Sequence, residues 1–185
     1  MSRIAVLRLG HRPSRDKRIT THVCLVARAF GAEGVYISGL RDDSIHSTLQ
    51  RVTETWGGNF WVEFVSNPMK VLDKWKVSGG VVAHLTMYGI PIKQVKNLIP
   101  LDRDLLIVVG GEKVPPQYYE KADFNVAIGS QPHSEVAALA IFLDRATNSA
   151  WESLNFEKAR LRIVPSERGK NVEQCQCDKK AFSDH

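Results

Sequence analysis

The chain has 185 residues, of which 43% are apolar and 24% charged, and its formal net charge is +5. A chain of this size can bury enough apolar surface for one compact domain, and this composition excludes a largely disordered protein. The sequence has neither an apolar run of about 18 residues nor the pattern of a signal peptide, so we expect a cytoplasmic protein that does not bind membranes.

Strands and helices are expected to alternate along most of the chain. Aliphatic runs followed by glycine favour strands, and apolar residues spaced three or four apart favour helices. The expected strands are residues 3–9, 34–38, 60–65, 80–85, 105–109 and 124–128, and the expected helices are residues 19–30, 42–56, 68–76, 91–98 and 134–145. Residues 10–18 are expected to form a loop, with Thr20 or Thr21 capping the helix that follows. This alternation predicts an α/β fold with a mostly parallel sheet flanked by helices.

The C-terminal part is expected to extend this domain. Trp151, Leu154 and Phe156 are apolar enough to pack back onto the body, and residues 159–164 are expected to add an edge strand. We therefore predict one domain over residues 1–165, with a C-terminal extension from about residue 148. The polar residues 166–185 are expected to form a mobile tail.

The three cysteines argue against both a disulfide framework and a metal site. Cys24 falls within an expected helix, whereas Cys175 and Cys177 form a close pair in the polar tail. One intervening residue is fewer than the two to four usual between zinc-binding cysteines. We therefore expect no bound metal.

Basic residues gather near the N-terminus. Between residues 8 and 18 there is one acidic residue, Asp16, and there are five basic ones: Arg8, Arg12, Arg15, Lys17 and Arg18. Because the planar guanidinium group donates two parallel hydrogen bonds to an anion, clustered arginines favour binding of phosphate groups. The cluster predicts a polyanionic partner; the alternative is a solvated basic surface.

Three glycine-bearing or polar loops follow expected strands, at residues 86–89, 110–114 and 129–133. Ligands of open α/β sheets bind outside the carboxyl ends of the strands, so these loops predict a small-molecule pocket there. The alternative is that the glycines only form turns. The sequence has no three-glycine dinucleotide fingerprint, no phosphate P-loop and no nucleophile elbow.

Four segments resemble one known family. They are LRLGHRPSRDKRITTHV at residues 7–23, followed along the chain by ARAFGA, VVGGEKVP and IGSQPHSEVAALAIFLDR. They resemble the archaeal tRNA (cytidine(56)-2′-O)-methyltransferases of the SPOUT superfamily, and the resemblance spans residues 3 to about 165. It implies S-adenosylmethionine-dependent methylation of cytidine 56 in the T-loop of tRNA. It also implies a C-terminal trefoil knot and a homodimer whose active sites combine residues of both subunits.

The resemblance also implies which residues bind the methyl donor. Ser130 stands where the family pattern has asparagine, which leaves backbone contacts possible there. Among the implied donor-binding residues, Glu112 and Lys113 have the character of solvated loop residues. His133 fits either a donor contact or a local structural contact. The implied donor-binding residues are Leu85, Gly110, Gly111, Glu112, Lys113, Val114, Ile128, Gly129, Ser130, Gln131, Pro132, His133, Ser134 and Glu135.

The resemblance assigns catalysis to an arginine near the N-terminus, and Arg18 fits best, with Arg12, Arg15 and Arg28 as rivals. A guanidinium group stays protonated in proteins, so we expect Arg18 to orient the ribose and stabilise negative charge rather than remove a proton. Arg8, Arg12, Arg15 and Lys17 are the expected RNA-binding residues. Two alternatives stay open: a tRNA-binding protein without catalysis, and a methyltransferase acting on a different RNA nucleotide.

Overall fold

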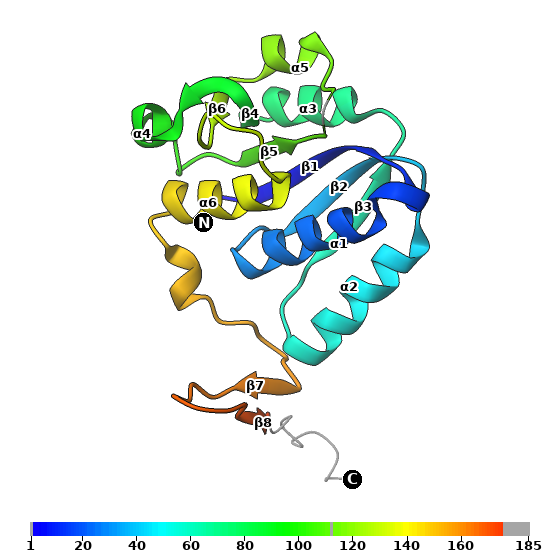
Figure 1. Cartoon of the computed structure of the whole chain (residues 1–185), viewed down its shortest axis with the longest axis vertical. Helices are drawn as coiled ribbons and strands as arrows, with labels where there is room; N and C mark the ends of the chain where they lie inside the picture. The colour runs from blue at the N-terminus through cyan, green and yellow to red at the C-terminus, as the bar shows by residue number, and fades with distance from the viewer. Residues whose placement is uncertain (1, 112, 176–185) are drawn as a thin grey trace, which may run out of the picture.

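A six-stranded parallel sheet forms the centre of the computed structural model, which describes residues 2–111 and 113–175 (Figure 1). The strand order is β3-β2-β1-β5-β4-β6, and every pairing in this sheet is parallel. The strands are β1 (Ile4–His11), β2 (Gly34–Gly39), β3 (Trp61–Val65), β4 (Val81–Pro91), β5 (Leu105–Val109) and β6 (Phe124–Ala127). The predicted α/β class and the parallel sheet are confirmed.

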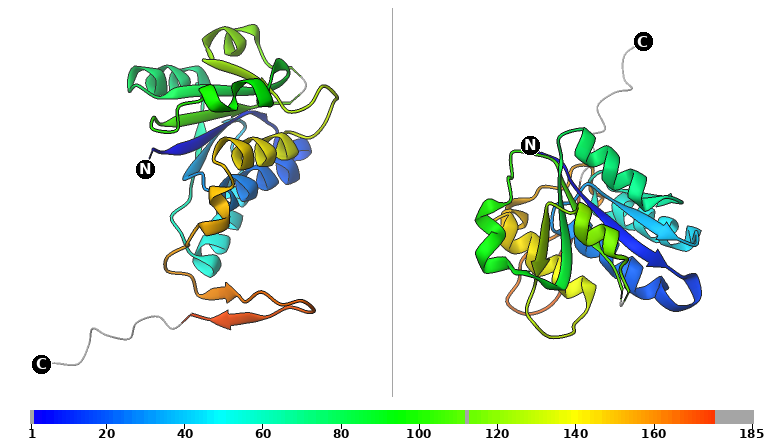
Figure 2. Two further views of the ribbon diagram at one scale, coloured as in Figure 1. Left: turned by 90° about the vertical axis from the view of Figure 1, so that its left-hand side faces the viewer. Right: turned by 90° about the horizontal axis from the view of Figure 1, so that it is seen from above.

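Helices cover both faces of the sheet. On one face α1 packs beside α6 and α2, and on the other α3 and α5 pack over the central strands (Figures 1 and 2). Neighbouring side chains of β1 alternate between the two cores, with Val6 in one and Leu7 in the other. This double burial explains why the strands read as continuous apolar runs. The helices are α1 (Pro13–Ala29), α2 (Asp43–Trp56), α3 (Pro68–Val77), α4 (Ile92–Val95), η1 (Lys96–Leu98), α5 (Pro116–Lys121), α6 (Glu135–Ala146) and η2 (Ala150–Ser153).

The expected loop over residues 10–18 is wrong, because β1 continues to His11 and helix α1 begins at Pro13, which leaves only Arg12 between them. Proline has no backbone N–H to leave unpaired and its φ is already helical, so it fits the first turn of a helix well. Thr20 and Thr21 therefore lie inside α1 and cap nothing. The consequence for function is that Arg15, Lys17 and Arg18 project from a helix rather than from a flexible loop.

The short helix α5 (Pro116–Lys121) was not predicted. Its six residues are too few to show an apolar period, although the two prolines before Gln117 are typical of a helix start. Tyr118 fixes α5 against the sheet, because its side chain is buried with the residues of α3.

The C-terminal extension packs against the end of the sheet where the strands begin. Trp151 lies against Phe30, with ring centroids 5.1 Å apart, and its indole N–H donates to Asp144 over 2.8 Å. Leu154 covers Gly31, and Phe156 lies beneath the guanidinium group of Arg28. The predicted packing of these three apolar residues onto the body is confirmed.

The extension ends in a separate hairpin of β7 (Leu161–Ile163) and β8 (Val172–Gln174), which projects beyond α2 (Figure 1). The expectation that residues 159–164 add a strand to the main sheet is wrong, because β7 pairs with β8 instead. Three residues of the expected mobile tail thus form a strand.

Within the described ranges, no helix is long and apolar enough to cross a membrane, and no group of three His, Cys, Asp or Glu side chains is placed to hold a metal ion.

Candidate functional site

The carboxyl end of the sheet, where the strands end, brings together the loops that the sequence singles out. Because β4 lies between β5 and β6, the segments that follow these three strands are neighbours. We call residues 110–114 and 128–133 the glycine loops. The strand order also reverses between β1 and β5, and ligands bind at such reversals in open α/β sheets.

Between the glycine loops, β4 carries a wide bulge. Leu85 and Ile90 both pair with Val126 of β6, so residues 86–89 are looped out of the ladder. A Cβ atom added to Gly89 would lie 2.5 Å from the backbone of Asn125, which shows how closely the bulge returns onto β6. The expected end of the strand at Leu85 is therefore an interruption, after which the strand continues to Pro91.

The second glycine loop closes on itself through His133. Its Nε2 atom hydrogen-bonds the carbonyl oxygen of Ile128, and its Nδ1 atom lies 3.1 Å from the carbonyl oxygen of Ser134. Ser134 caps α6 by accepting a hydrogen bond from the backbone N–H of Val136. Gly129 has a φ of +76°, a conformation that favours glycine. Of the two interpretations of His133, the structure supports the local structural contact.

Two glycines leave open space at this end of the sheet. A Cβ atom added to Gly111 or Gly129 would meet no described atom within 4 Å, whereas one added to Gly110 would lie 2.6 Å from Val114. Gly110 is thus needed for packing, and Gly111 and Gly129 allow a ligand to approach the backbone. Of the other expected donor-binding residues, Glu112 lies outside the described residues, Leu85 and Ile128 are buried, and Lys113, Ser130, Gln131 and Pro132 are exposed.

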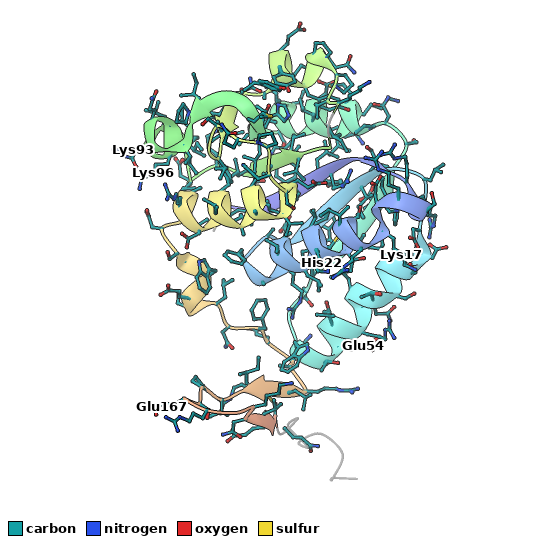
Figure 3. All side chains as sticks on the ribbon, viewed as in Figure 1. Lys17, His22, Glu54, Lys93, Lys96 and Glu167 are labelled. Carbon is teal, nitrogen blue, oxygen red and sulfur yellow. The ribbon has the colours of Figure 1, made fainter. Side chains whose placement is uncertain are left out.

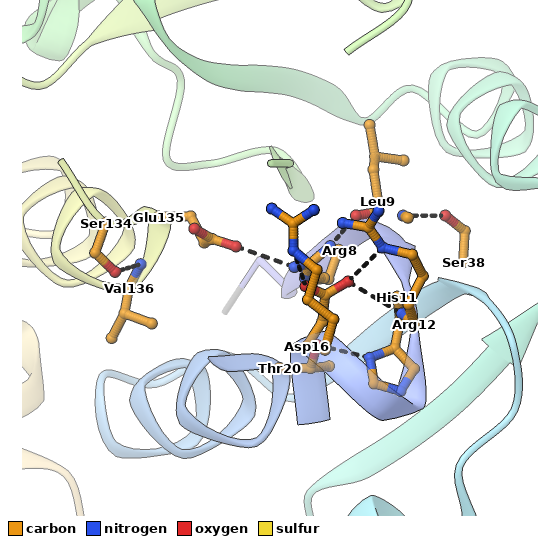
Figure 4. A network of polar contacts seen from close by, with 12 residues as sticks. Arg8, Leu9, His11, Arg12, Asp16, Thr20, Ser38, Ser134, Glu135 and Val136 are labelled. Carbon is orange, nitrogen blue, oxygen red and sulfur yellow. Dashed lines mark hydrogen bonds and ion pairs between the residues drawn. The ribbon is translucent and has the colours of Figure 1, made fainter. Parts of the chain in front are cut away.

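A buried ion pair links β1 to the start of α6 (Figure 4). Arg8 Nη2 lies 3.0 Å from Glu135 Oε1, and Nη1 donates to the carbonyl oxygen of Leu9. Nε is buried and has no hydrogen-bond partner among the described residues. Burial lowers the pKa of Arg8, and the charge of Glu135 opposes this effect. With 2% of its surface exposed, Arg8 does not present its guanidinium group to a phosphate, so its assignment as an RNA-binding residue is not supported. Because the carboxylate of Glu135 is held in this ion pair, it too has a structural role.

Asp16 organises the first turn of α1. Its carboxylate accepts hydrogen bonds from the backbone N–H and from Nε of Arg12, each over 3.1 Å (Figure 4). Burial raises the pKa of Asp16, but the hydrogen bonds from Arg12 and the charges of Arg12 and Arg8 outweigh it and lower the pKa overall. The result is a charged Asp16 that fixes Arg12 near the carboxyl end of β1.

His11, which the sequence did not single out, links the middle of α1 to the start of α2. Its Nδ1 atom lies 2.9 Å from the hydroxyl of Thr20, and its Nε2 atom lies 3.8 Å from a carboxylate oxygen of Asp42. Burial and the charge of Arg8 lower the pKa of His11, so it is neutral near pH 7. A single histidine after a glycine carries no sequence signal for such a role.

One exposed side of α1 carries the remaining basic residues. We call the exposed residues Arg15, Lys17 and Arg18 the basic face; Figure 3 labels Lys17. Arg15 lies 3.8 Å from Asp16, whereas the charged groups of Lys17 and Arg18 have no hydrogen bond or ion pair with any residue that the structure describes. The basic face borders an open hollow of about 490 Å³, lined by Pro13, Ser14, Arg15, Lys17, Arg18, Thr21 and His22.

Arg28, one of the rivals for the catalytic role, lies at the opposite end of α1. It is ten residues beyond Arg18, about 15 Å along the helix axis. Its Nη2 atom donates to the carbonyl oxygen of Gly57 over 2.6 Å, and its guanidinium carbon lies 4.6 Å from the ring centroid of Phe156. Arg28 is buried, so it serves the packing of the extension and lies away from the glycine loops.

Sequence comparison identifies closely similar proteins. A family model described as "tRNA ribose 2′-O-methyltransferase, aTrm56" matches residues 56–173. The tRNA (cytidine(56)-2′-O)-methyltransferase of Methanopyrus kandleri is 57% identical over 172 residues, which cover 93% of this chain and 97% of that protein. The protein of the same name from Thermococcus kodakarensis is 54% identical over 177 residues, which cover 94% and 98%.

Solved structures of low sequence identity share the fold. The TrmH/SpoU tRNA modifying enzyme of A. aeolicus has a TM-score of 0.61 at 17% identity, with 82% of this chain and 77% of that chain covered. The SpoU methyltransferase AviRb from Streptomyces viridochromogenes, in complex with the cofactor AdoMet, has a TM-score of 0.57 at 20% identity, with 80% and 58% covered. These similarities confirm a SPOUT-type fold.

Proposed function

The chain belongs to the tRNA ribose 2′-O-methyltransferase family aTrm56, and from this premise we propose that it methylates the ribose 2′-hydroxyl of cytidine 56 in tRNA. The observation that carries the proposal is the pairing of open glycine loops with an exposed basic helix at one end of the sheet. The loops suit a small donor and the helix suits an RNA backbone.

We propose S-adenosylmethionine as the donor, which when bound supplies an electrophilic methyl group on a sulfonium centre. The residues present fit such a ligand, because Gly111 and Gly129 leave their backbone accessible and the buried side chain of Leu85 offers apolar contact. The residues that would hold it are those of the two glycine loops, together with Leu85 and Ser134. Glu135 supports this site indirectly, through its ion pair with Arg8.

Arg18 is proposed to act on the acceptor. A ribose hydroxyl is a weak nucleophile near neutral pH, so the reaction is helped by groups that stabilise negative charge as it develops on the oxygen. Arg18 is exposed and has no partner among the described residues, so its guanidinium group is free to donate hydrogen bonds to that oxygen. The guanidinium group orients the oxygen and does not remove its proton.

We further propose that the protein works as a homodimer, with Arg18 of one protomer facing the glycine loops of the other, and that its C-terminal half forms a trefoil knot. Both features rest on the family. Exposed apolar side chains on three neighbouring elements support a subunit interface: Ile90 on β4, Leu98 on η1 and Ile141 on α6. We also propose a cytoplasmic location, where the protein would meet its tRNA.

A complementation experiment tests the shared site. Arg18→Ala removes the proposed acceptor group, and Gly129→Val blocks the proposed donor loop, so neither homodimer should methylate tRNA. Mixing the two variants should restore activity in heterodimers, because one of the two sites is then intact. Sedimentation checks that the dimer forms; an active Arg18→Ala homodimer or an inactive mixture of confirmed heterodimers contradicts the shared site.

The activity itself is tested by incubating the protein with labelled S-adenosylmethionine and unmodified tRNA. Mass spectrometry should locate the methyl group on the ribose of cytidine 56, and tRNA with 2′-deoxycytidine at that position should stay unlabelled. Calorimetry should show one donor bound per protomer. Methylation elsewhere would indicate a different target nucleotide, and absence of donor binding would indicate a tRNA-binding protein without catalysis.

A further inference from the structure

Tyr88 is an exposed aromatic residue at the carboxyl end of the sheet. It lies in the bulge of β4, and 79% of its surface is exposed. A single exposed aromatic residue is common on protein surfaces and by itself indicates nothing. The position of Tyr88 and the way in which its segment is held distinguish it.

Three contacts hold the bulge in place. The hydroxyl of Thr86 lies 3.2 Å from the hydroxyl of Tyr119 on α5, and it accepts a 3.4 Å hydrogen bond from the backbone N–H of Tyr88. At the other end of the bulge, Gly89 approaches the backbone of Asn125 so closely that no larger residue fits. The bulge therefore has a defined conformation that projects Tyr88 outward.

Tyr119 is itself anchored from below. Its ring meets the ring of His84 edge-on, with centroids 4.6 Å apart, and its carbonyl oxygen accepts a hydrogen bond from the side-chain amide of Asn125 over 2.8 Å. The side-chain oxygen of Asn125 in turn lies 2.9 Å from Nδ1 of the fully buried His84. The support of Tyr88 is thus a partly buried polar network that joins β4, β6 and α5.

The bulge lies between the two glycine loops. His84 pairs with Val108 of β5, so the following residues run past the end of β5 towards Gly110. After the bulge, Pro91 pairs with Ala127 at the end of β6, next to Ile128. Lys93 on α4 is exposed and follows closely along the chain, which adds positive charge near the bulge (Figure 3).

We propose that Tyr88 is a stacking surface for a nucleobase of the RNA substrate, beside the methylated nucleotide. Unpaired RNA bases stack on exposed aromatic side chains. Because the bulge holds the backbone of Tyr88 in one conformation, less conformational entropy is lost when a base stacks on its ring. An RNA base fits better than the adenine of the donor, because small-molecule sites bury most of their ligand in a concave pocket, whereas Tyr88 stands almost free. This inference rests on the proposed function, which places the donor in the neighbouring loops.

The test compares Tyr88→Ala with Tyr88→Phe in steady-state methylation of tRNA. Loss of the ring should raise the KM for tRNA about tenfold, within the range measured for one base stacked on an aromatic side chain. Because stacking needs the ring and not the hydroxyl, Tyr88→Phe should bring KM back to within about twofold of the wild-type value. Calorimetry should show the same donor affinity in all three proteins.

A matched control removes another exposed apolar side chain far from the site. Val77, at the end of α3, is 88% exposed, and Val77→Ala should leave the KM for tRNA unchanged. An unchanged KM in Tyr88→Ala overturns the inference. So does weaker donor binding, which would indicate stacking on adenine, or loss of the dimer on sedimentation, which would indicate a subunit contact.

The same measurements separate this inference from the proposed function. If the wild-type protein binds no donor or leaves cytidine 56 unmethylated, the proposed function fails. If the wild-type protein methylates that nucleotide and Tyr88→Ala does so with the same KM, only the role of Tyr88 fails.

Discussion

The two ends of the sheet use arginine in opposite ways. At the amino end, where the strands begin, Arg28 donates to Gly57 and lies over the ring of Phe156. Nearby, Asp144 accepts hydrogen bonds from Ser149 and from Trp151, each over 2.8 Å. At the carboxyl end, Arg18 is exposed and has no partner among the described residues.

This difference separates packing from binding. A polar group whose hydrogen bonds are already made inside the chain gains little from a ligand, whereas an exposed cation without a partner can take one. Arg8 refines the contrast, because it lies at the carboxyl end and yet is buried against Glu135. The position of an arginine in the fold thus does not by itself predict its role. Its burial and its hydrogen-bond partners decide whether it packs or binds.

The sharpest test of the contrast is Arg18→Ala. Loss of a group that stabilises charge in the transition state should lower kcat on the order of a thousandfold, because such donors act mainly on the chemical step. Donor affinity, measured by calorimetry, should stay close to that of the wild-type protein. A variant with near wild-type turnover would move the catalytic role to Arg12 or Arg15, the remaining exposed rivals.

The next largest effect is expected on stability, from Arg8→Met. This change leaves the carboxylate of Glu135 partly buried without its partner, which should lower the free energy of unfolding by about 3 kcal/mol. Urea denaturation measures the change. The double variant Arg8→Met with Glu135→Leu should regain most of the stability, and a single variant as stable as the wild-type protein would show that the pair is not needed.

A smaller loss of stability is expected from Arg28→Met. The change removes the hydrogen bond to Gly57 and the contact with Phe156, which should cost about 2 kcal/mol. Because Arg28 lies at the amino end, kcat per folded molecule should stay unchanged. A drop in kcat without a drop in stability would return Arg28 to the catalytic candidates.

The sequence predicted the sheet well because buried parallel strands have a distinctive apolar pattern, as residues 105–109 show. It also placed the glycine loops, since parallel strands all end on one side. The sequence did not predict the start of α1 at Pro13, because the charged residues that follow show no apolar helical period. It also did not predict the burial of Arg8, because that burial depends on Glu135, more than a hundred residues away along the chain. Packing between distant segments leaves no local sequence signal.

The smallest expected effect is on the salt dependence of tRNA binding. Each cation that contacts a phosphate releases counterions, so Lys17→Gln should reduce the slope of log K against log salt concentration by about 0.7 to 0.9. The slope is measured by repeating a tRNA binding titration at several salt concentrations. Lys74→Gln is the matched control, because Lys74 is also exposed but lies on α3, on the other face of the sheet.

The control decides how the result is interpreted, because both substitutions remove the same charge. If the basic face of α1 contacts the RNA backbone, the slope falls for Lys17→Gln and stays the same for Lys74→Gln. Equal changes in both variants would mean that the slope reports the net charge of the protein rather than a contact. In that case Lys17 would be a solvated surface charge, and the contrast between the two ends of the sheet would rest on Arg18 alone.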